Sequence, residues 1–183
     1  MSRRQIANRS PYFCYARETI AGMLELASTS LPSGYQIHLK EGFRPASLQR
    51  TGFEHVLGRI AKKYQHLSEA DCRRIASEYV APPEVAGHPT GGAVDVTLLY
   101  DGSELNLGTE FNAEPDETEQ RTYTGSHGLT EEERANRNIL INAMTSVGFI
   151  NYPTEWWHWS FGDKYWSWIS RKKVRYEPIE TLE

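Results

Sequence analysis

One short run places the tightest limit on how this chain of 183 residues folds: residues 93–100 are largely apolar and rich in β-branched side chains. The pair Gly91-Gly92 precedes the run and Asp101-Gly102 follows it, which predicts a strand that ends in a tight turn. Asp95 lies between two valines, so the alternation of a strand turns its side chain away from theirs. Because a buried, unpaired carboxylate is costly, Asp95 must face solvent, a partner or a cation.

The periodicity of the rest of the chain predicts an α+β fold. Segments with helical spacing or helical caps are residues 15–29, 46–64, 68–80 and 130–147. Segments with strand-like alternation or β-prone aromatic composition are residues 35–39, 93–100 and 149–161. Because helices and strands fall in separate runs, we expect a small antiparallel sheet flanked by helices, in a single domain over residues 1–183. The polar stretch 106–129 is predicted to be a long functional or mobile loop.

Charge and composition argue against two classes of partner. The net charge of −4 and the pI near 5.9 are unlike those of nucleic-acid-binding proteins, which usually carry a basic face. No stretch approaches a membrane span, and the first twenty residues lack the apolar run of a secretory signal. Neither Cys14 nor Cys72 lies in a C-x-x-C pair, so both are expected to be buried or half-buried thiols in a reducing cytoplasm. We therefore expect a cytoplasmic protein, and no feature predicts an oligomeric state.

Two stretches about sixty residues apart contain the ligand types of a catalytic zinc site. They are His88-Pro-Thr-Gly-Gly-Ala-Val-Asp95 and Glu155-Trp-Trp-His158. Catalytic zinc usually has three protein ligands and a fourth position for water. His88, Asp95 and His158 supply three ligands for one zinc ion. Glu155 is then available as the base that takes a proton from the attacking water, so the pattern predicts a metallohydrolase.

Each stretch alone also has a plainer interpretation. Residues 88–95 fit a surface loop that enters an amphipathic edge strand, and residues 155–158 fit a half-buried aromatic strand with an incidental histidine. On a regular strand, residues three apart face opposite sides, so Glu155 and His158 need a bend or bulge to share one metal ion. Pro153, just upstream, favours an irregular backbone there. The two stretches together are far more specific than either one.

Arg44, in the segment Gly42-Phe-Arg-Pro45, is the third element of the predicted site. It follows the strand predicted at residues 35–39, and the proline stiffens the backbone beside it. Amide hydrolysis places negative charge on the former carbonyl oxygen, and a fixed guanidinium stabilises that charge. A structural ion pair is the alternative interpretation of this arginine.

At these residues the chain resembles the zinc D-alanyl-D-alanine dipeptidases of the vancomycin-resistance type, which belong to a wider group of zinc D,D-peptidases. The pattern of that family is His-x-x-Gly-x-Ala-x-Asp followed by Glu-x-x-His, and residues 88–95 and 155–158 match it. The resemblance spans residues 35–168 and includes Phe43-Arg-Pro45 and Leu107-Gly-Thr-Glu-Phe-Asn112. It implies the hedgehog-like α+β fold of zinc D,D-peptidases, with the zinc ligands, the base and the oxyanion-stabilising arginine at the positions given above.

Two positions depart from the family pattern. The dipeptidases usually have Ser-x-His at the first ligand and Phe-Asp after the Gly-Ser/Thr segment, whereas this chain has Ala86 and Asn112 at the corresponding positions. By the resemblance, these positions help to hold the ammonium group of the substrate, and Glu110 or Glu114 is a candidate to replace the missing charge. Asn112, Glu114 and Trp157 are the predicted substrate-binding residues.

The resemblance implies a small peptide partner, D-alanyl-D-alanine, which is hydrolysed to D-alanine. The second interpretation is a zinc D,D- or L,D-carboxypeptidase, or an endopeptidase, that acts on peptidoglycan peptides. A third is a binding module that keeps a structural zinc site but has lost catalysis. Glu155 and Arg44 argue against the third, because a structural zinc site requires neither.

Overall fold

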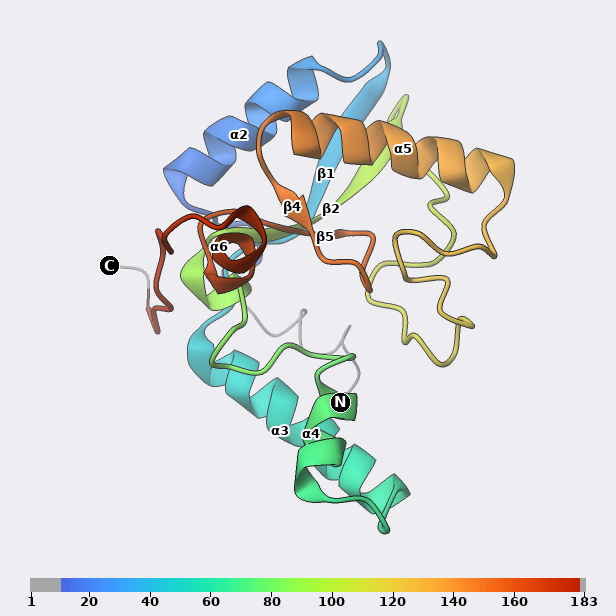
Figure 1. Cartoon of the computed structure of the whole chain (residues 1–183). Coiled ribbons are helices and arrows are strands. Elements are labelled where there is room, and N and C mark those ends of the chain that lie inside the picture. The colour runs from blue at the N-terminus through green and yellow to red at the C-terminus, as the bar shows by residue number, and fades with distance from the viewer. Residues whose placement is uncertain (1–10, 182–183) are drawn as a thin grey trace.

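The computed structural model describes residues 11–181 and has the expected α+β architecture, with an antiparallel sheet flanked by helices (Figure 1). Its elements are α2 (Glu18–Thr29), β1 (Tyr35–Glu41), α3 (Ala46–Lys63), α4 (Glu69–Ala76), a 3-10 turn (His88–Thr90), β2 (Ala93–Tyr100), β3 (Ser103–Glu104), α5 (Glu131–Ser146), β4 (Ile150–Asn151), β5 (His158–Ser160) and α6 (Lys164–Ser170). Residues 1–10, on which the expectation of no secretory signal partly rests, lie outside the described residues.

The sheet has the strand order β1-β2-β5-β4, and the short β3 folds back onto β2 through the predicted turn at Asp101-Gly102. Strands β1 and β2 pair in regular register as far as Leu39, after which a bulge pairs Glu41 with Asp95. On its other side β2 pairs with β5, and there Asp95 lies opposite His158. Asp95 therefore has a carboxylate-bearing neighbour on one strand and an imidazole-bearing neighbour on the other.

Alternation along β2 separates the main core from the face that carries Asp95. Val94, Val96 and Leu98 are buried in the main core with residues of α2 and α5, which cover that face of the sheet (Figure 1). Full burial of each such aliphatic side chain contributes about 1.5–3 kcal/mol to folding. Asp95 is nevertheless only 2% exposed. Of the three environments predicted for its carboxylate, solvent is therefore excluded.

Helices α3 and α4 form a hairpin on the other side of the sheet, with a small core of their own (Figure 1). Ser68 accepts a hydrogen bond from the backbone N–H of Asp71 and caps α4, as predicted. The predicted end of this helix near Val80 is wrong, because α4 ends at Ala76 and the chain continues in turns. Those turns place Val80 in the hairpin core, where it is 5% exposed.

The long loop at residues 106–129 is held in place by α5. The predicted capping box at Thr130 and Glu133 opens this helix. One turn later the buried Arg137 donates hydrogen bonds to backbone carbonyl oxygens of Leu107, Arg121 and Tyr123. Burial lowers the pKa of Arg137 to about 10, and the guanidinium stays protonated at neutral pH. A single side chain thus connects both ends of the predicted loop to the helix.

The aromatic C-terminal region differs from the single β-prone segment predicted at residues 149–161. Only two short strands form there, β4 and β5, and a turn joins them. Helix α6, which was not predicted from the sequence, follows directly and is capped by Asp163. Four of the five tryptophans in this region are buried, whereas Trp168 on α6 is 75% exposed.

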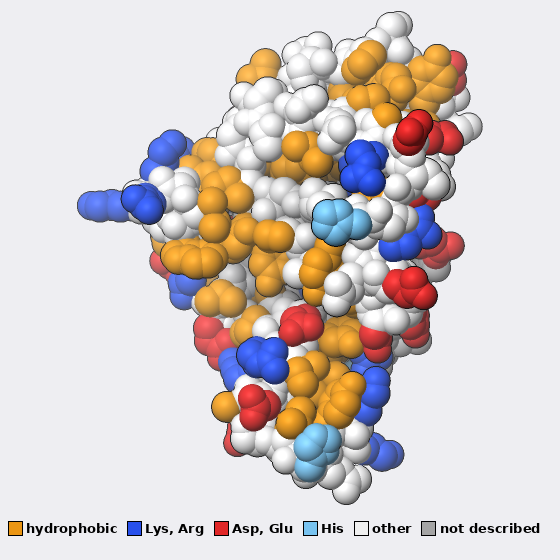
Figure 2. Space-filling view, turned by 45° about the vertical axis from the view of Figure 1, so that its right-hand side comes forward, with side chains coloured by type: hydrophobic (Ala, Val, Ile, Leu, Met, Phe, Trp, Pro, Cys, Tyr) orange, Lys and Arg blue, Asp and Glu red, His pale blue; other side chains and the backbone are white. Residues whose placement is uncertain are grey.

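No helix in residues 11–181 combines the length and the apolar character that a bilayer-spanning segment needs. On the face drawn in Figure 2, acidic and basic side chains are interspersed, and hydrophobic side chains gather along one flank and in the lower part. Both cysteines are free thiols; Cys72 is buried as expected, whereas Cys14 is exposed, so the expected burial of Cys14 is wrong.

Candidate metal centre and active site

The pairing of β2 with β5 builds the centre of the site. Asp95 and His158 are register partners, and Nδ1 of the imidazole lies 2.9 Å from Oδ1 of the carboxylate. The other imidazole nitrogen, Nε2, lies 3.4 Å from the hydroxyl of Ser160. These contacts fix the orientation of the ring, so Nδ1 is the atom of His158 that faces the carboxylate.

His88 reaches Asp95 from a 3-10 turn just before β2. Gly91 ends that turn in the left-handed region, with φ at 66°, a backbone conformation that glycine adopts without strain. The Nδ1 atom of His88 lies 2.8 Å from the carbonyl oxygen of Gly42 and donates to it. The other ring nitrogen of His88, Nε2, lies 3.3 Å from Asp95 Oδ1 and is the atom that faces the carboxylate.

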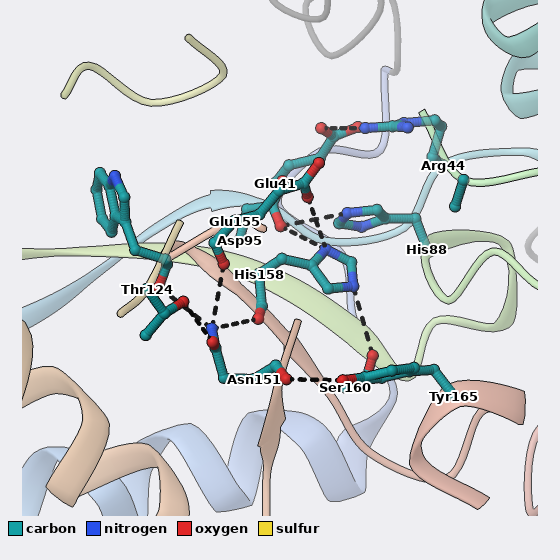
Figure 3. Close-up of polar contacts among 12 residues, drawn as sticks. Glu41, Arg44, His88, Asp95, Thr124, Asn151, Glu155, His158, Ser160 and Tyr165 are labelled. Carbon is teal, nitrogen blue, oxygen red and sulfur yellow. Dashed lines mark hydrogen bonds and ion pairs between the residues drawn. The ribbon is translucent and has the colours of Figure 1, made fainter. Parts of the chain in front are cut away.

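These three side chains meet the requirements of a divalent metal site. One ligand atom from each of His88, Asp95 and His158 lies within 4.8 Å of the others (Figure 3). Zinc bonds of about 2 Å bring ligand atoms to within about 4 Å of each other, so small rotations of the imidazoles close the triad around an ion. Each imidazole also has an oxygen partner on its second nitrogen, as is usual for metal-bound histidine. The donor set of two nitrogens and one carboxylate oxygen fits zinc.

The ionisable groups of the triad shift each other's pKa values. Burial by itself raises the pKa of Asp95, but the charges and hydrogen bonds of His88 and His158 outweigh it, and the pKa lies well below its ordinary range. Burial by itself lowers the pKa of His158, but the hydrogen bond and charge of Asp95 raise it above its ordinary value, with a contribution from Glu155. The metal-free site therefore favours an ionised carboxylate beside a protonated imidazole.

Glu155 joins the triad because the chain between β4 and β5 turns sharply. The backbone N–H of Glu155 donates to the carbonyl of Tyr152, and that of His158 donates to the carbonyl of Glu155. This turn is the bend that a shared site requires of two residues three apart. Oε2 of Glu155 consequently lies 3.9 Å from Nδ1 of His158.

Asn151 holds this turn from within. Its side-chain amide donates to the carbonyl oxygens of Glu155, at 3.1 Å, and His158, at 3.0 Å (Figure 3). Its own Oδ1 accepts from the hydroxyl of Thr124 at 2.5 Å. No residue pattern identifies Asn151, because its role depends on carbonyl positions that exist only in the folded turn.

Arg44 fits both interpretations of it, the structural ion pair and the fixed cation beside the reaction centre. Its Nε and Nη2 donate to both carboxylate oxygens of Glu41, at 2.7 and 2.6 Å, and Nη1 donates to Gln49 at 2.8 Å. Burial lowers the pKa of Arg44, but the charge of Glu41 raises it above its ordinary value, with smaller contributions from Asp95 and Glu155. Arg44 is thus a fixed cation in a buried ion pair, and it also lines the cavity of the triad.

The triad opens into a cavity of about 340 Å³, a size typical of small-molecule sites. Of the predicted site residues, His88, Asp95, His158, Glu155, Arg44 and Asn112 line it. Asn112 is 8% exposed, and its Nδ2 is buried with no hydrogen-bond partner among the described residues. The cavity therefore brings together the zinc ligands, the candidate base, a cation and a free amide.

Glu114 and Trp157 do not line this cavity. Glu114 lies at a neighbouring hollow and forms an ion pair with Arg59 at 3.2 Å. Trp157 is fully buried in the core, with its ring 5.9 Å from that of Phe111. Substrate contact by these two residues stays a prediction that this arrangement does not support.

Known proteins resemble most of the chain. The D-alanyl-D-alanine dipeptidase of Synechocystis sp. (strain PCC 6803) is 27% identical over 192 residues, which cover 87% of this chain and 73% of the relative. The D-alanyl-D-alanine dipeptidase of Enterococcus faecium is 27% identical over 162 residues, which cover 82% and 77%. The solved structure of VanYB in complex with D-alanine-D-alanine has 17% identity and a TM-score of 0.45, over 78% of this chain and 67% of that chain.

A protein-family comparison gives the same result over nearly the whole sequence. The model of the peptidase M15 family, described as D-ala-D-ala dipeptidase, matches residues 4–176. That span includes both metal-binding stretches and the cavity that they line. The chain therefore belongs to the peptidase M15 family of D-Ala-D-Ala dipeptidases.

Proposed function

We propose that this member of the family hydrolyses D-alanyl-D-alanine to D-alanine with one zinc ion held by His88, Asp95 and His158. One observation carries the proposal: Glu155 lies 3.9 Å from His158 and lines the same cavity as the triad. A structural metal site has no use for a partly exposed carboxylate beside its ligands. A hydrolytic site does, because water must lose a proton as it attacks.

When bound, zinc lowers the pKa of a water ligand to about 7 and polarises the peptide carbonyl. Every proton transfer is assigned to Glu155, whose side chain is 16% exposed toward the cavity. Its carboxylate accepts the proton of the attacking water and then returns it to the leaving amine. The turn held by Asn151 fixes the position of this carboxylate relative to His158.

Arg44 is assigned the role of stabilising the negative charge that develops on the former carbonyl oxygen. Both carboxylate oxygens of Glu41 hold the guanidinium in place, so no reorganisation is needed during the reaction. The planar group has five N–H donors, and the three contacts to Glu41 and Gln49 leave two of them for substrate.

A direct assay tests the proposal. The purified protein is incubated with D-alanyl-D-alanine and with L-alanyl-L-alanine, after zinc loading and after chelation, and released alanine is measured. We expect zinc-dependent release from the D,D-peptide only. Release that persists in chelator, or release from neither peptide with zinc bound, would overturn the proposed function.

A zinc carboxypeptidase acting on longer peptidoglycan peptides is the second candidate, and Asn112 favours it. The side chain of Asn112 is an uncharged amide that lines the cavity, and its Nδ2 donor has no hydrogen-bond partner among the described residues. Such a group pairs more naturally with a peptide group than with the free ammonium of a dipeptide. Nα-acetyl-D-alanyl-D-alanine separates the two candidates, because a dipeptidase prefers the free amine and a carboxypeptidase prefers the acylated substrate.

The cytoplasmic location stays a prediction.

A further inference from the structure

A row of aromatic rings leads from the metal ligand His158 to the exposed rim of the cavity. The centroid distances are 5.9 Å from His158 to Tyr152, 5.1 Å from Tyr152 to Tyr165, and 6.2 Å from Tyr165 to Trp168. All four residues line the cavity of the triad. One wall of the site is therefore aromatic from the metal centre to the solvent.

Helix α6 presents one face to this cavity. Lys164, Tyr165 and Trp168 lie on that face, because residues four apart are neighbours on a helix. Trp168 is 75% exposed, so most of its ring is available for contact with a ligand in the cavity. The apolar side chains of Val80 and Val85 line the same cavity, and Val85 is itself 48% exposed.

Lys164 adds a cation to this aromatic wall. Its ammonium group donates to the backbone carbonyl of Glu84 at 2.8 Å and forms no ion pair within residues 11–181. The other long cation of the cavity, Arg44, is already neutralised by Glu41. Apart from the metal centre, a carboxylate that enters the cavity thus finds an unpaired side-chain cation at Lys164, one helical turn from Trp168.

We propose that this face of α6 is the subsite for the C-terminal residue of the substrate, and that it selects a bulky apolar side chain there. Lys164 binds the terminal carboxylate, and Tyr165, Trp168 and Val85 contact the side chain. The inference rests on the proposed function and adds a preference to it: among D-alanyl dipeptides, those that end in a large apolar D-residue are the better substrates. A methyl group covers little of this wall, whereas a phenyl ring buries on the order of 150–250 Å².

Kinetics of the zinc-loaded enzyme test the side-chain preference. We expect kcat/KM for D-alanyl-D-phenylalanine to exceed that for D-alanyl-D-alanine by about tenfold, in line with hydrophobic-pocket discrimination. Trp168→Ala should reduce this ratio about tenfold, and Trp168→Phe should restore most of it. Ile169→Ala is the matched control, because Ile169 is 46% exposed on the same helix and does not line the cavity. A wild-type ratio of one or less, or a ratio that Trp168→Ala does not change, overturns the proposal.

Terminal carboxylate recognition is tested with D-alanyl-D-phenylalanine amide. The wild type should prefer the free acid over the amide by about tenfold, as expected for the loss of a charge-assisted contact. Lys164→Gln should abolish that preference and Lys164→Arg should retain it. Equal preference in the wild type and in Lys164→Gln contradicts the assignment of the carboxylate to this lysine.

Binding without turnover separates this inference from the proposed function. Calorimetry with the zinc-loaded Glu155→Gln variant compares the two dipeptides, and the double variant Glu155→Gln/Trp168→Ala repeats the comparison. Tighter binding of the phenylalanine peptide that depends on Trp168 supports the subsite even if no peptide is hydrolysed. If D-alanyl-D-alanine is hydrolysed but the two dipeptides show no difference in binding that depends on Trp168, the proposed function stands and the proposed subsite is wrong.

Discussion

Asp95 and His158 face each other across β2 and β5, with the imidazole Nδ1 2.9 Å from the carboxylate oxygen Oδ1. This pairing raises the pKa of His158, because its protonated form is stabilised by an ionised neighbour. The same nitrogen is the one that a metal ion needs as a lone pair. Proton and metal therefore compete for one atom of the site.

Metal affinity should consequently depend on pH with a defined sign. Below the raised pKa of His158, binding of zinc must release a proton, so affinity should fall about tenfold for each pH unit of acidification. Above that pKa the affinity should level off. Calorimetric titration with zinc in buffers of different ionisation enthalpy measures the released proton directly. A pH-independent affinity with no proton release would show that His158 is neutral in the metal-free site.

The metal-free protein should show the matching effect on stability. The raised pKa means that protonated His158 contributes stability that is fully present below its ordinary pKa of about 6.5 and is lost as pH rises through the folded-state value. Urea unfolding of the chelator-treated protein at several pH values measures this loss. His158→Ala is the control, and its unfolding free energy should lose that pH dependence.

Replacement of Glu155 should separate catalysis from metal binding. Glu155→Gln keeps the size of the side chain but removes the base, so kcat should fall by about 10²–10⁴ while one zinc ion remains bound. His158→Ala should lose both zinc and turnover, because a ligand is missing. Metal analysis and steady-state kinetics on the same preparations distinguish the two variants. A Glu155→Gln enzyme with most of its kcat would remove Glu155 from the mechanism.

Asn151 should act as a positioning residue for both Glu155 and His158. Asn151→Ala removes the hydrogen bonds to their carbonyl oxygens, and loss of such supporting contacts typically costs about 10–100-fold in metal affinity or activity. We expect a decrease in kcat with little change in KM, since Asn151 does not line the cavity. Asn142→Ala, at an exposed position on α5, is the control. A change confined to unfolding free energy, with kcat intact, would reduce Asn151 to a structural role.

Local chemistry explains which parts of the fold were predictable. The run at residues 93–100 and the capping box at Thr130 carry their structural cause in adjacent residues, and both formed as expected. Helix α6 was missed although Asp163 caps it, because its tryptophans and the β-prone run before it obscured the helical spacing. The end of α4 was placed too late, because tertiary burial of Val80 overrides helix propensity there.

The same distinction holds for the site. Zinc ligands were recognisable because few residue types bind the metal and the two stretches match a specific pattern, and the structure brings all three together. The partners of those residues were not recognisable. Glu41 reaches Arg44 and lies opposite Asp95 only because a bulge shifts the register after Leu39. Asn151 acts through backbone oxygens, whose positions depend on the folded turn.

The buried ion pair of Arg44 and Glu41 should make a large difference to the unfolding free energy when one partner is removed. The two side chains are 9% and 0% exposed, so removing one partner leaves a buried, uncompensated charge. Such a change costs about 3–5 kcal/mol, and we expect this decrease in unfolding free energy for Arg44→Met. The double variant Arg44→Met/Glu41→Leu removes both charges and should recover most of the loss, because apolar replacements of buried pairs are often neutral. Urea unfolding of Arg44→Met, of Glu41→Leu and of the double variant measures the coupling free energy of the pair. Activity should stay low in the double variant even where stability returns, since the proposed oxyanion contact is gone. Strictly additive changes in unfolding free energy would contradict a coupled pair.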